Sequence, residues 1–123
     1  MLRGARVLVA EDETFIALDL ADTFENAGAS VIGPAATVKE ALRLLATEPV
    51  DSALLDFNLA DGDVTPVLEL LAGRGVPIVI YTGRGLPAEL MWNHPDLPVI
   101  RKPLPPARIV AELAAARERA AQG

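Results

Sequence analysis

The chain has no cysteine, which excludes disulfide bonds and thiolate chemistry and is typical of a cytoplasmic protein. It has a single histidine, His94, which precedes a proline in a loop-like stretch, so we expect this side chain to be solvated. One histidine without cysteine cannot build a typical zinc site. No apolar run reaches the roughly 18 residues of a membrane span, and no secretory signal is visible.

Basic residues are also scarce. The chain has two lysines, no basic run and a net charge of −6. Such a chain has little electrostatic attraction to the phosphate backbone of a nucleic acid, so we expect no direct nucleic-acid binding. We also expect no membrane partner. Its 123 residues suffice to bury one core, and we expect a single domain over residues 1–123.

Short apolar runs rich in Val and Ile alternate with amphipathic segments along the whole chain. This alternation predicts an α/β doubly wound parallel sheet, (βα)5, with helices on both faces. Ligands of such sheets bind outside the carboxyl ends of the strands. The predicted strands are residues 6–10, 30–33, 51–55, 76–81 and 98–101.

Several helix boundaries can be read from local signals. Gly28 ends the first helix, and Thr37 to Glu40 form a capping box that opens the second. Between Leu86 and Pro95 the prolines allow about two turns, so we expect a short or mobile fourth helix there. The Ala-rich residues 114–123 continue the last helix. Prolines that suit a first helical turn are Pro66 and Pro106.

Carboxylates follow two of the predicted strands. Glu11 and Asp12 follow the first strand, and Asp56 follows the third. In a parallel sheet these strand ends lie side by side, where two like charges about 4 Å apart repel by about 4 kcal/mol near a protein surface. A divalent cation and the basic side chain of Lys102, at the end of the last strand, would neutralise them.

The residue types at this edge favour phosphoryl chemistry. Oxygen donors suit Mg²⁺ or Mn²⁺, and Glu11, Asp12 and Asp56 can supply them together with the backbone carbonyl of Asn58. An aspartate can attack a phosphoryl group to give an aspartyl phosphate. Such a transfer needs charge neutralised on the phosphoryl oxygens. The remaining candidates for that task are Lys102 and the Thr82 hydroxyl.

Four segments carry a resemblance to a known family. They are Val7–Glu13, Leu54–Leu59, Tyr81–Gly83 and Lys102–Pro103, each at a predicted strand end and in matching order. Over essentially its whole length the chain resembles a receiver domain of two-component response regulators. The resemblance implies a flavodoxin-like five-stranded sheet in the order 2-1-3-4-5 and a cis peptide at Lys102–Pro103.

The resemblance also implies roles for the strand-end residues. Asp56 matches the phosphoacceptor, supplied by a phosphohistidine on a histidine kinase or a histidine phosphotransfer protein. Glu11 and Asp12 match the metal-binding acidic pair, Thr82 the switch hydroxyl, and Lys102 the lysine that contacts the phosphoryl group. Such a domain is not an enzyme, since it catalyses only its own phosphorylation and dephosphorylation.

Two details point to a subgroup of receivers. The segment Val79–Gly85 is similar to the threonine-glycine motif of atypical receivers, which occur as single-domain regulators or attached to histidine kinases. Arg84 and Gly85 replace the aromatic end of that motif. Val99 stands where receivers often carry an aromatic switch residue. A downstream protein would then bind the Thr82–Lys102 face, with homodimerisation on phosphorylation a further possibility.

Three other functions fit parts of the pattern. A receiver-like docking module that is never phosphorylated would not need the intact set of acids, Thr82 and Lys102. A Mg²⁺-dependent phosphatase of the haloacid-dehalogenase type needs an acid where Asn58 stands, and the chain has no room for its cap domain. A flavodoxin-like flavin binder lacks the phosphate-binding loop, and Glu11 and Asp12 would repel a phosphate there.

Overall fold

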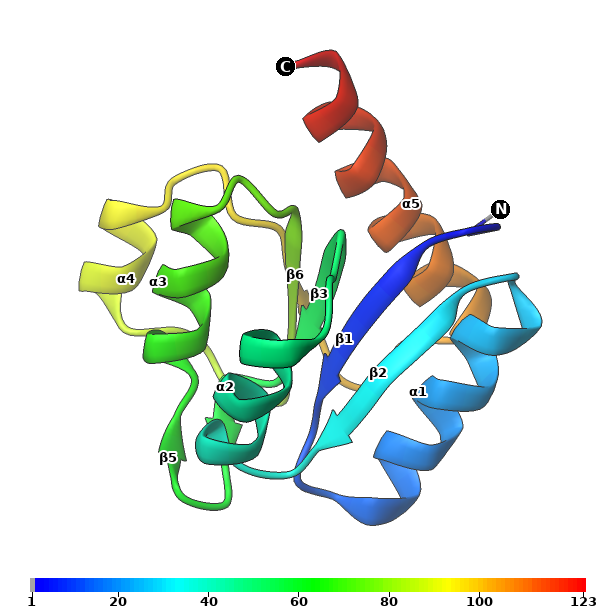
Figure 1. Cartoon of the computed structure of the whole chain (residues 1–123). Helices are drawn as coiled ribbons and strands as arrows, with labels where there is room; N and C mark the ends of the chain where they lie inside the picture. Colours follow the sequence, from blue (N-terminus) through cyan, green and yellow to red (C-terminus); the bar gives the residue numbers. More distant parts are fainter. Residues whose placement is uncertain (1) are drawn as a thin grey trace.

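Five strands pair in parallel in the computed structural model, which describes residues 2–123 (Figure 1). The sheet order is β2-β1-β3-β6-β7, so the predicted order 2-1-3-4-5 is confirmed once an additional two-stranded hairpin, β4–β5, is set aside. The sheet strands are β1 (Arg6–Ala10), β2 (Ser30–Ala35), β3 (Ser52–Leu55), β6 (Ile78–Thr82) and β7 (Val99–Arg101). The helices are α1 (Thr14–Asn26), α2 (Val38–Thr47), α3 (Thr65–Gly73), α4 (Ala88–Asn93) and α5 (Pro106–Gln122).

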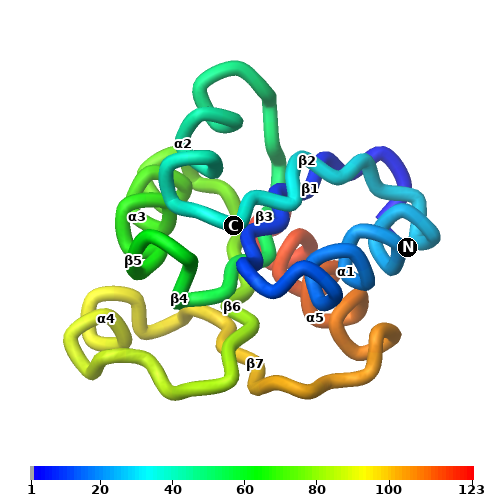
Figure 2. Tube along the Cα trace, turned by 90° about the horizontal axis from the view of Figure 1, so that it is seen from below, coloured from blue at the N-terminus to red at the C-terminus, as the bar shows by residue number. Residues whose placement is uncertain are grey.

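Helices cover both faces of this sheet (Figure 2). One core lies under α1 and α5, where Phe24 and Leu113 are fully buried. The other lies under α2 and α3, and α4 adds Leu90 to it. The central strands β3 and β6 are buried at every residue because helices pack on both of their faces. No helix within residues 2–123 is long and apolar enough to span a bilayer.

The predicted helix signals hold with small changes. Gly28 follows α1 with φ of +99°, a conformation that favours glycine, and it ends the helix. Thr37 caps α2 by accepting a hydrogen bond from the Glu40 N–H (3.0 Å). The Glu40 side chain binds Arg43 rather than completing the capping box. The predicted short helix is α4, with six residues, and α5 continues to Gln122.

Four features differ from the prediction. Strands β3, β6 and β7 begin one or two residues later than predicted, and β6 continues to Thr82. Strand β2 continues past Gly33 to Ala35, so it is longer than expected. The Asp61-Gly62 turn joins two short strands, β4 (Asn58–Leu59) and β5 (Gly62–Asp63), which pair antiparallel. The prediction of a solvated His94 is wrong: its Nε2 lies 2.8 Å from Oε1 of Glu69 on α3, because the end of α4 packs back onto that helix.

Candidate functional site

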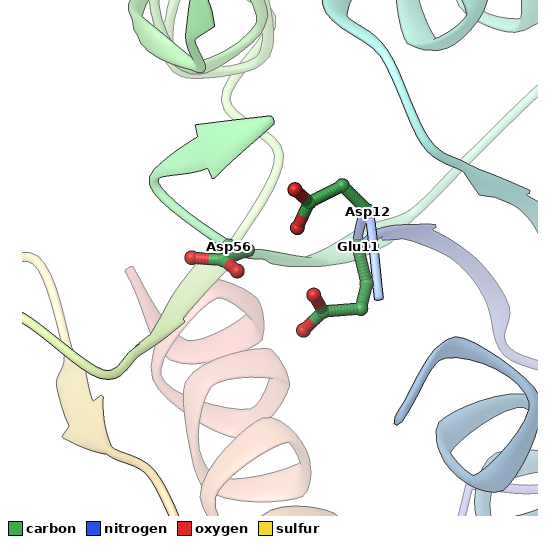
Figure 3. Close-up of side chains that lie close together, drawn as sticks. All are labelled: Glu11, Asp12 and Asp56. Atoms are coloured by element: carbon green, nitrogen blue, oxygen red, sulfur yellow. The ribbon is translucent and has the colours of Figure 1, made fainter. Parts of the chain in front are cut away.

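The acidic residues after β1 and β3 lie together at the carboxyl edge of the sheet (Figure 3). Ala10 pairs with Leu55 in the parallel register, so the residues that follow them leave the sheet side by side. One carboxylate oxygen from each of Glu11, Asp12 and Asp56 lies within 4.8 Å of the others. The folded sheet therefore holds three negative groups in one small volume.

Lys102 reaches the same cluster from the end of β7. Its Nζ donates hydrogen bonds to Glu11 Oε1 (2.6 Å) and to Asp56 Oδ2 (2.9 Å). It also lies over the Tyr81 ring, 5.6 Å from the centroid, a distance at which a ring attracts a cation. The Tyr81 hydroxyl accepts a hydrogen bond from the Leu104 N–H (3.1 Å), which fixes the ring in place. No pattern in the sequence predicts this support for the lysine.

The charges of the cluster are not balanced. Glu11 and Asp56 are only 2% and 8% exposed, whereas Asp12 is exposed. Burial raises the pKa of Glu11 from 4.5 to about 7, and the charge of Asp56 adds to this, against the hydrogen bonds from Lys102 and the Glu13 N–H. Burial also disfavours the charged Lys102, but its hydrogen bonds to both acids outweigh this and raise its pKa. The single positive charge of Lys102 is thus shared between the two buried carboxylates of Glu11 and Asp56.

Thr82 and Lys102 lie on neighbouring strand ends. Thr82 pairs with Arg101 across β6 and β7, and the Lys102 N–H donates to the Thr82 carbonyl (2.9 Å). The Thr82 hydroxyl oxygen accepts a hydrogen bond from the Arg84 N–H (3.3 Å). The peptide bond between Lys102 and Pro103 is cis, as the resemblance implied.

An open pocket of about 350 Å³ lies above these side chains. Asp56 forms part of its lining, together with Asn58, Thr82 and Lys102. The second Asp56 oxygen, Oδ1, accepts a long hydrogen bond of 3.4 Å from the Asn58 N–H. The pocket thus leaves this oxygen accessible to a small group. Its full lining is Asp12, Glu13, Asp56, Asn58, Thr82, Gly83, Arg84 and Lys102.

The donor set fits a small, hard divalent cation. All three side chains offer carboxylate oxygens, and Asn58, whose backbone carbonyl is a further oxygen donor, lines the adjoining pocket. Magnesium usually takes one or two carboxylates and retains waters, which the exposure of Asp12 permits. Receiver domains bind Mg²⁺ at an acidic pocket of this kind.

A parallel (βα)5 sheet with acids, a threonine and a lysine at its carboxyl edge defines the class of phosphoryl-regulated signalling domains. The family described as Response regulator receiver domain matches residues 7–114 of the chain. The chain therefore belongs to the response regulator receiver domain family of two-component signalling, whose members are generally signalling modules rather than enzymes.

Individual relatives agree with this assignment. The chain is 33% identical over 118 residues to the phyllosphere-induced regulator PhyR of Methylorubrum extorquens, covering 92% of this chain and 43% of that protein. The solution structure of SdrG from Sphingomonas melonis Fr1 shares 35% identity with a TM-score of 0.78, covering 93% of this chain and 96% of that one. A CheY-like receiver from Methanospirillum hungatei has a TM-score of 0.85 at 25% identity, covering 99% and 98%. The chain spans less than half the length of the curated relatives it matches.

Proposed function

We propose that Asp56 accepts a phosphoryl group from a phosphohistidine and that this modification changes binding to a downstream protein. The observation that carries the proposal is the setting of the Asp56 carboxylate. One of its oxygens is held by Lys102 at 2.9 Å, and the other faces an open pocket beside two further acids. The donor would be a histidine kinase or a histidine phosphotransfer protein in a phosphorelay.

The transfer can be written with the residues present. Oδ1 of Asp56 attacks phosphorus while the bond from phosphorus to the donor histidine nitrogen breaks. The electron pair stays on that nitrogen, and because the other ring nitrogen of the donor carries a proton, the ring leaves as neutral imidazole. Glu11, Asp12, Asp56 and the Asn58 carbonyl would hold Mg²⁺, which when bound neutralises charge on the phosphoryl oxygens. Lys102, 2.9 Å from Asp56 Oδ2, supplies a further positive charge.

The hydroxyl of Thr82 supplies the response to phosphorylation. Its oxygen accepts from the Arg84 N–H, which leaves its hydrogen free to donate to a new phosphoryl oxygen. Rotation toward that oxygen would disturb the loop that leads from β6 to α4. Because Val99 offers no aromatic ring that could change rotamer, this loop is the proposed route of the signal.

The proposed downstream surface is the Thr82–Lys102 face, which includes α4. There Trp92 and Met91, two adjacent large apolar side chains, are 85% and 52% exposed and could pack against a partner. We propose a protein partner in the cytoplasm, or a second phosphorylated copy of the chain, rather than nucleic acid or a membrane. The only reactions proposed for the chain itself are its own phosphorylation and dephosphorylation, with Asn58 and Arg84 placed to influence water access.

Intact mass spectrometry after incubation with acetyl phosphate tests the proposal. We expect one phosphoryl adduct that requires Mg²⁺ in the wild-type protein and is absent in Asp56→Asn. A modified Asp56→Asn protein would refute the assigned residue. If the wild-type protein gains no adduct, the same experiment with a phosphorylated histidine phosphotransfer protein as donor separates a selective receiver from a docking module that is never phosphorylated.

A further inference from the structure

The tip of the β4–β5 hairpin is tied to another part of the molecule by one side chain. Asp61 accepts hydrogen bonds from the N–H groups of Val38 (2.6 Å, to Oδ1) and Lys39 (3.1 Å, to Oδ2), the first two residues of α2. Beside them, the Ala60 N–H donates to the carbonyl of Ala36 (3.1 Å). Both oxygens of one carboxylate thus bind a helix more than twenty residues earlier in the chain.

This tie is favourable although Asp61 is exposed. The hydrogen bond from the Val38 N–H lowers the pKa of Asp61 below its ordinary value, and the bond from Lys39 adds to the effect. A carboxylate at a helix N-terminus also interacts well with the helix dipole. Thr37 binds a different donor, the Glu40 N–H, so Thr37 and Asp61 divide the free N–H groups of α2 between them. Within residues 2–123, the side chain of Asp61 is the only one that hydrogen-bonds that helix to the hairpin.

The other end of the hairpin lies in the candidate site. Strand β4 begins at Asn58, two residues after Asp56, and pairs with β5 through Asp63. The Val64 N–H donates to the Phe57 carbonyl at 2.7 Å and closes the base of the hairpin. Because β4 has only two residues, fixing the tip of the hairpin restricts the position of Asn58.

From this geometry we infer that Asp61 is a positioning residue for the metal site. Its two hydrogen bonds to α2 hold the β4–β5 hairpin so that Asn58, whose N–H lies 3.4 Å from Asp56 Oδ1, stays beside Asp56. The inference rests on the proposed function, because that function assigns the Asn58 carbonyl to the Mg²⁺ site. It also makes α2, which contributes no side chain to the pocket, a support for metal binding.

Calorimetric titration of the full chain with MgCl₂ tests the inference. In Asp61→Ala we expect the Mg²⁺ affinity to fall about tenfold, a typical loss when a group supporting a metal ligand is removed. The rate of phosphorylation by acetyl phosphate should need more Mg²⁺ but approach the wild-type value at saturation. Amide hydrogen exchange over residues 58–63 should become faster in the metal-free protein.

Two further variants separate positioning from other effects. Thr37→Ala removes a cap from the same helix but leaves the tie to the hairpin, so it should keep the wild-type Mg²⁺ affinity even where its melting temperature falls. Asp61→Asn loses the charge yet keeps one acceptor oxygen, so its affinity should lie between those of the wild type and Asp61→Ala. If Asp61→Ala does not fold, Asp61→Asn provides the test, and we expect its Mg²⁺ affinity to be several-fold lower than that of the wild type.

Several results would overturn the inference. The first is a wild-type Mg²⁺ affinity in the Asp61 variants, and the second is an equal loss of affinity in Thr37→Ala. The third is an equal loss of affinity in Asp61→Asn and Asp61→Ala, which would indicate that Asp61 acts only through the long-range effect of its charge. A wild-type protein that binds Mg²⁺ and is phosphorylated, alongside unaffected Asp61 variants, overturns this inference alone. A wild-type protein that neither binds Mg²⁺ nor becomes phosphorylated overturns the proposed function and this inference together.

Discussion

At the scale of single residues, the main feature is a shortage of positive charge. Lys102 is the one basic side chain that contacts the acidic cluster among the described residues, and it binds Glu11 and Asp56. Asp12 has no such partner, although one of its carboxylate oxygens lies within 4.8 Å of oxygens of the other two acids. Its main effect in the metal-free protein is therefore repulsion, partly screened by solvent.

We therefore expect Asp12→Ala to stabilise the metal-free protein by about 1 kcal/mol, because it removes repulsion at an exposed position. Urea unfolding in the presence of a chelator measures this. Asp96→Ala makes the same charge change at an exposed loop position outside the cluster and serves as the control. Added Mg²⁺ should stabilise the wild type more than Asp12→Ala. Equal or lower stability of Asp12→Ala in chelator would contradict the repulsion.

The buried Glu11 predicts an unusual pH dependence of folding. Its pKa is raised from 4.5 to about 7 in the folded protein, so between these values the folded state binds more protons than the unfolded state. The free energy of unfolding should therefore fall as the pH rises from about 4.5 to about 7, by at most about 3 kcal/mol, and then level off.

Urea unfolding without metal at pH 5 and pH 8 measures this dependence. Glu11→Gln should flatten it, because glutamine has no proton to lose but can still accept from Lys102. Observation of the Glu11 side-chain carboxyl by NMR gives the titration directly. The prediction fails if Glu11 titrates at its ordinary pKa and the unfolding free energies of the wild type and Glu11→Gln change equally with pH. Lys102 would then compensate fully for the effect of burial on the pKa of Glu11.

At the scale of secondary-structure elements, α4 is the most weakly attached helix. Leu90 is its only buried side chain, whereas its neighbour Trp92 is exposed. The contact between His94 and Glu69 at 2.8 Å joins the end of this helix to α3. A six-residue helix has little stability of its own, so these contacts decide whether it forms.

We expect Leu90→Ala to reduce stability by about 2 kcal/mol, the lower range for a buried leucine, because a short surface helix can partly close the cavity. Hydrogen exchange should become faster over residues 86–98 and remain slow in β1 and β3. Trp92→Ala, two positions away, should change the stability by less than about 0.5 kcal/mol. Similar losses in both variants would mean that Trp92 packs against the domain in solution.

The regular elements could be predicted from the sequence because their patterns are local. The strand from Arg6 to Ala10 has the predicted bounds, and Gly28 ends α1 as expected. The hairpin β4–β5 was missed because strands of two residues have no periodicity. The contact of His94 with Glu69 was missed because it depends on how α4 returns to α3, which no local pattern records.

For the candidate site, the sequence predicted which strand ends meet but not how their side chains contact one another. Parallel topology alone places the ends of neighbouring strands together, so the approach of Asp56 to Glu11 followed from the order of the elements. The hydrogen bonds that Lys102 donates to both acids, and the position of the Tyr81 ring next to its ammonium, depend on side-chain geometry, which no local pattern records. The link from Asp61 to α2 is of the same kind, since nothing in the sequence pairs these segments.

At the scale of the whole molecule, two groups of loops surround the pocket at the carboxyl edge of the sheet, and they differ in how firmly they are held. On one side the loops after β1, β2 and β3 are joined by backbone hydrogen bonds, including those from Glu11 to Ala35 (2.9 Å) and from Asp56 to Ala10 (2.8 Å). On the other side the chain after Thr82 runs to α4 with fewer contacts. A new charge at Asp56 should therefore move the second group more than the first.

Thr82 is the residue that would transmit this movement. We expect Thr82→Ala to accept a phosphoryl group from acetyl phosphate within about tenfold of the wild-type rate, because Lys102 and the acids remain. In the wild type, phosphorylation should shift the amide resonances of α4 and β7. In Thr82→Ala these shifts should shrink, because no hydroxyl remains to turn from the Arg84 N–H toward the phosphoryl oxygen.

Thr82→Ser provides the decisive control, because it restores the hydroxyl without the methyl group. The wild type, Thr82→Ala and Thr82→Ser should carry similar levels of the phosphoryl adduct. If the amide resonance shifts of α4 and β7 then recover in Thr82→Ser, the hydroxyl transmits the change and the packing of the methyl group does not. Full shifts in phosphorylated Thr82→Ala would instead assign transmission to Lys102, whose ammonium holds Glu11 and Asp56 and has a third N–H to donate to a phosphoryl oxygen. The signal would then travel through β7 and α5 and bypass the loop before α4.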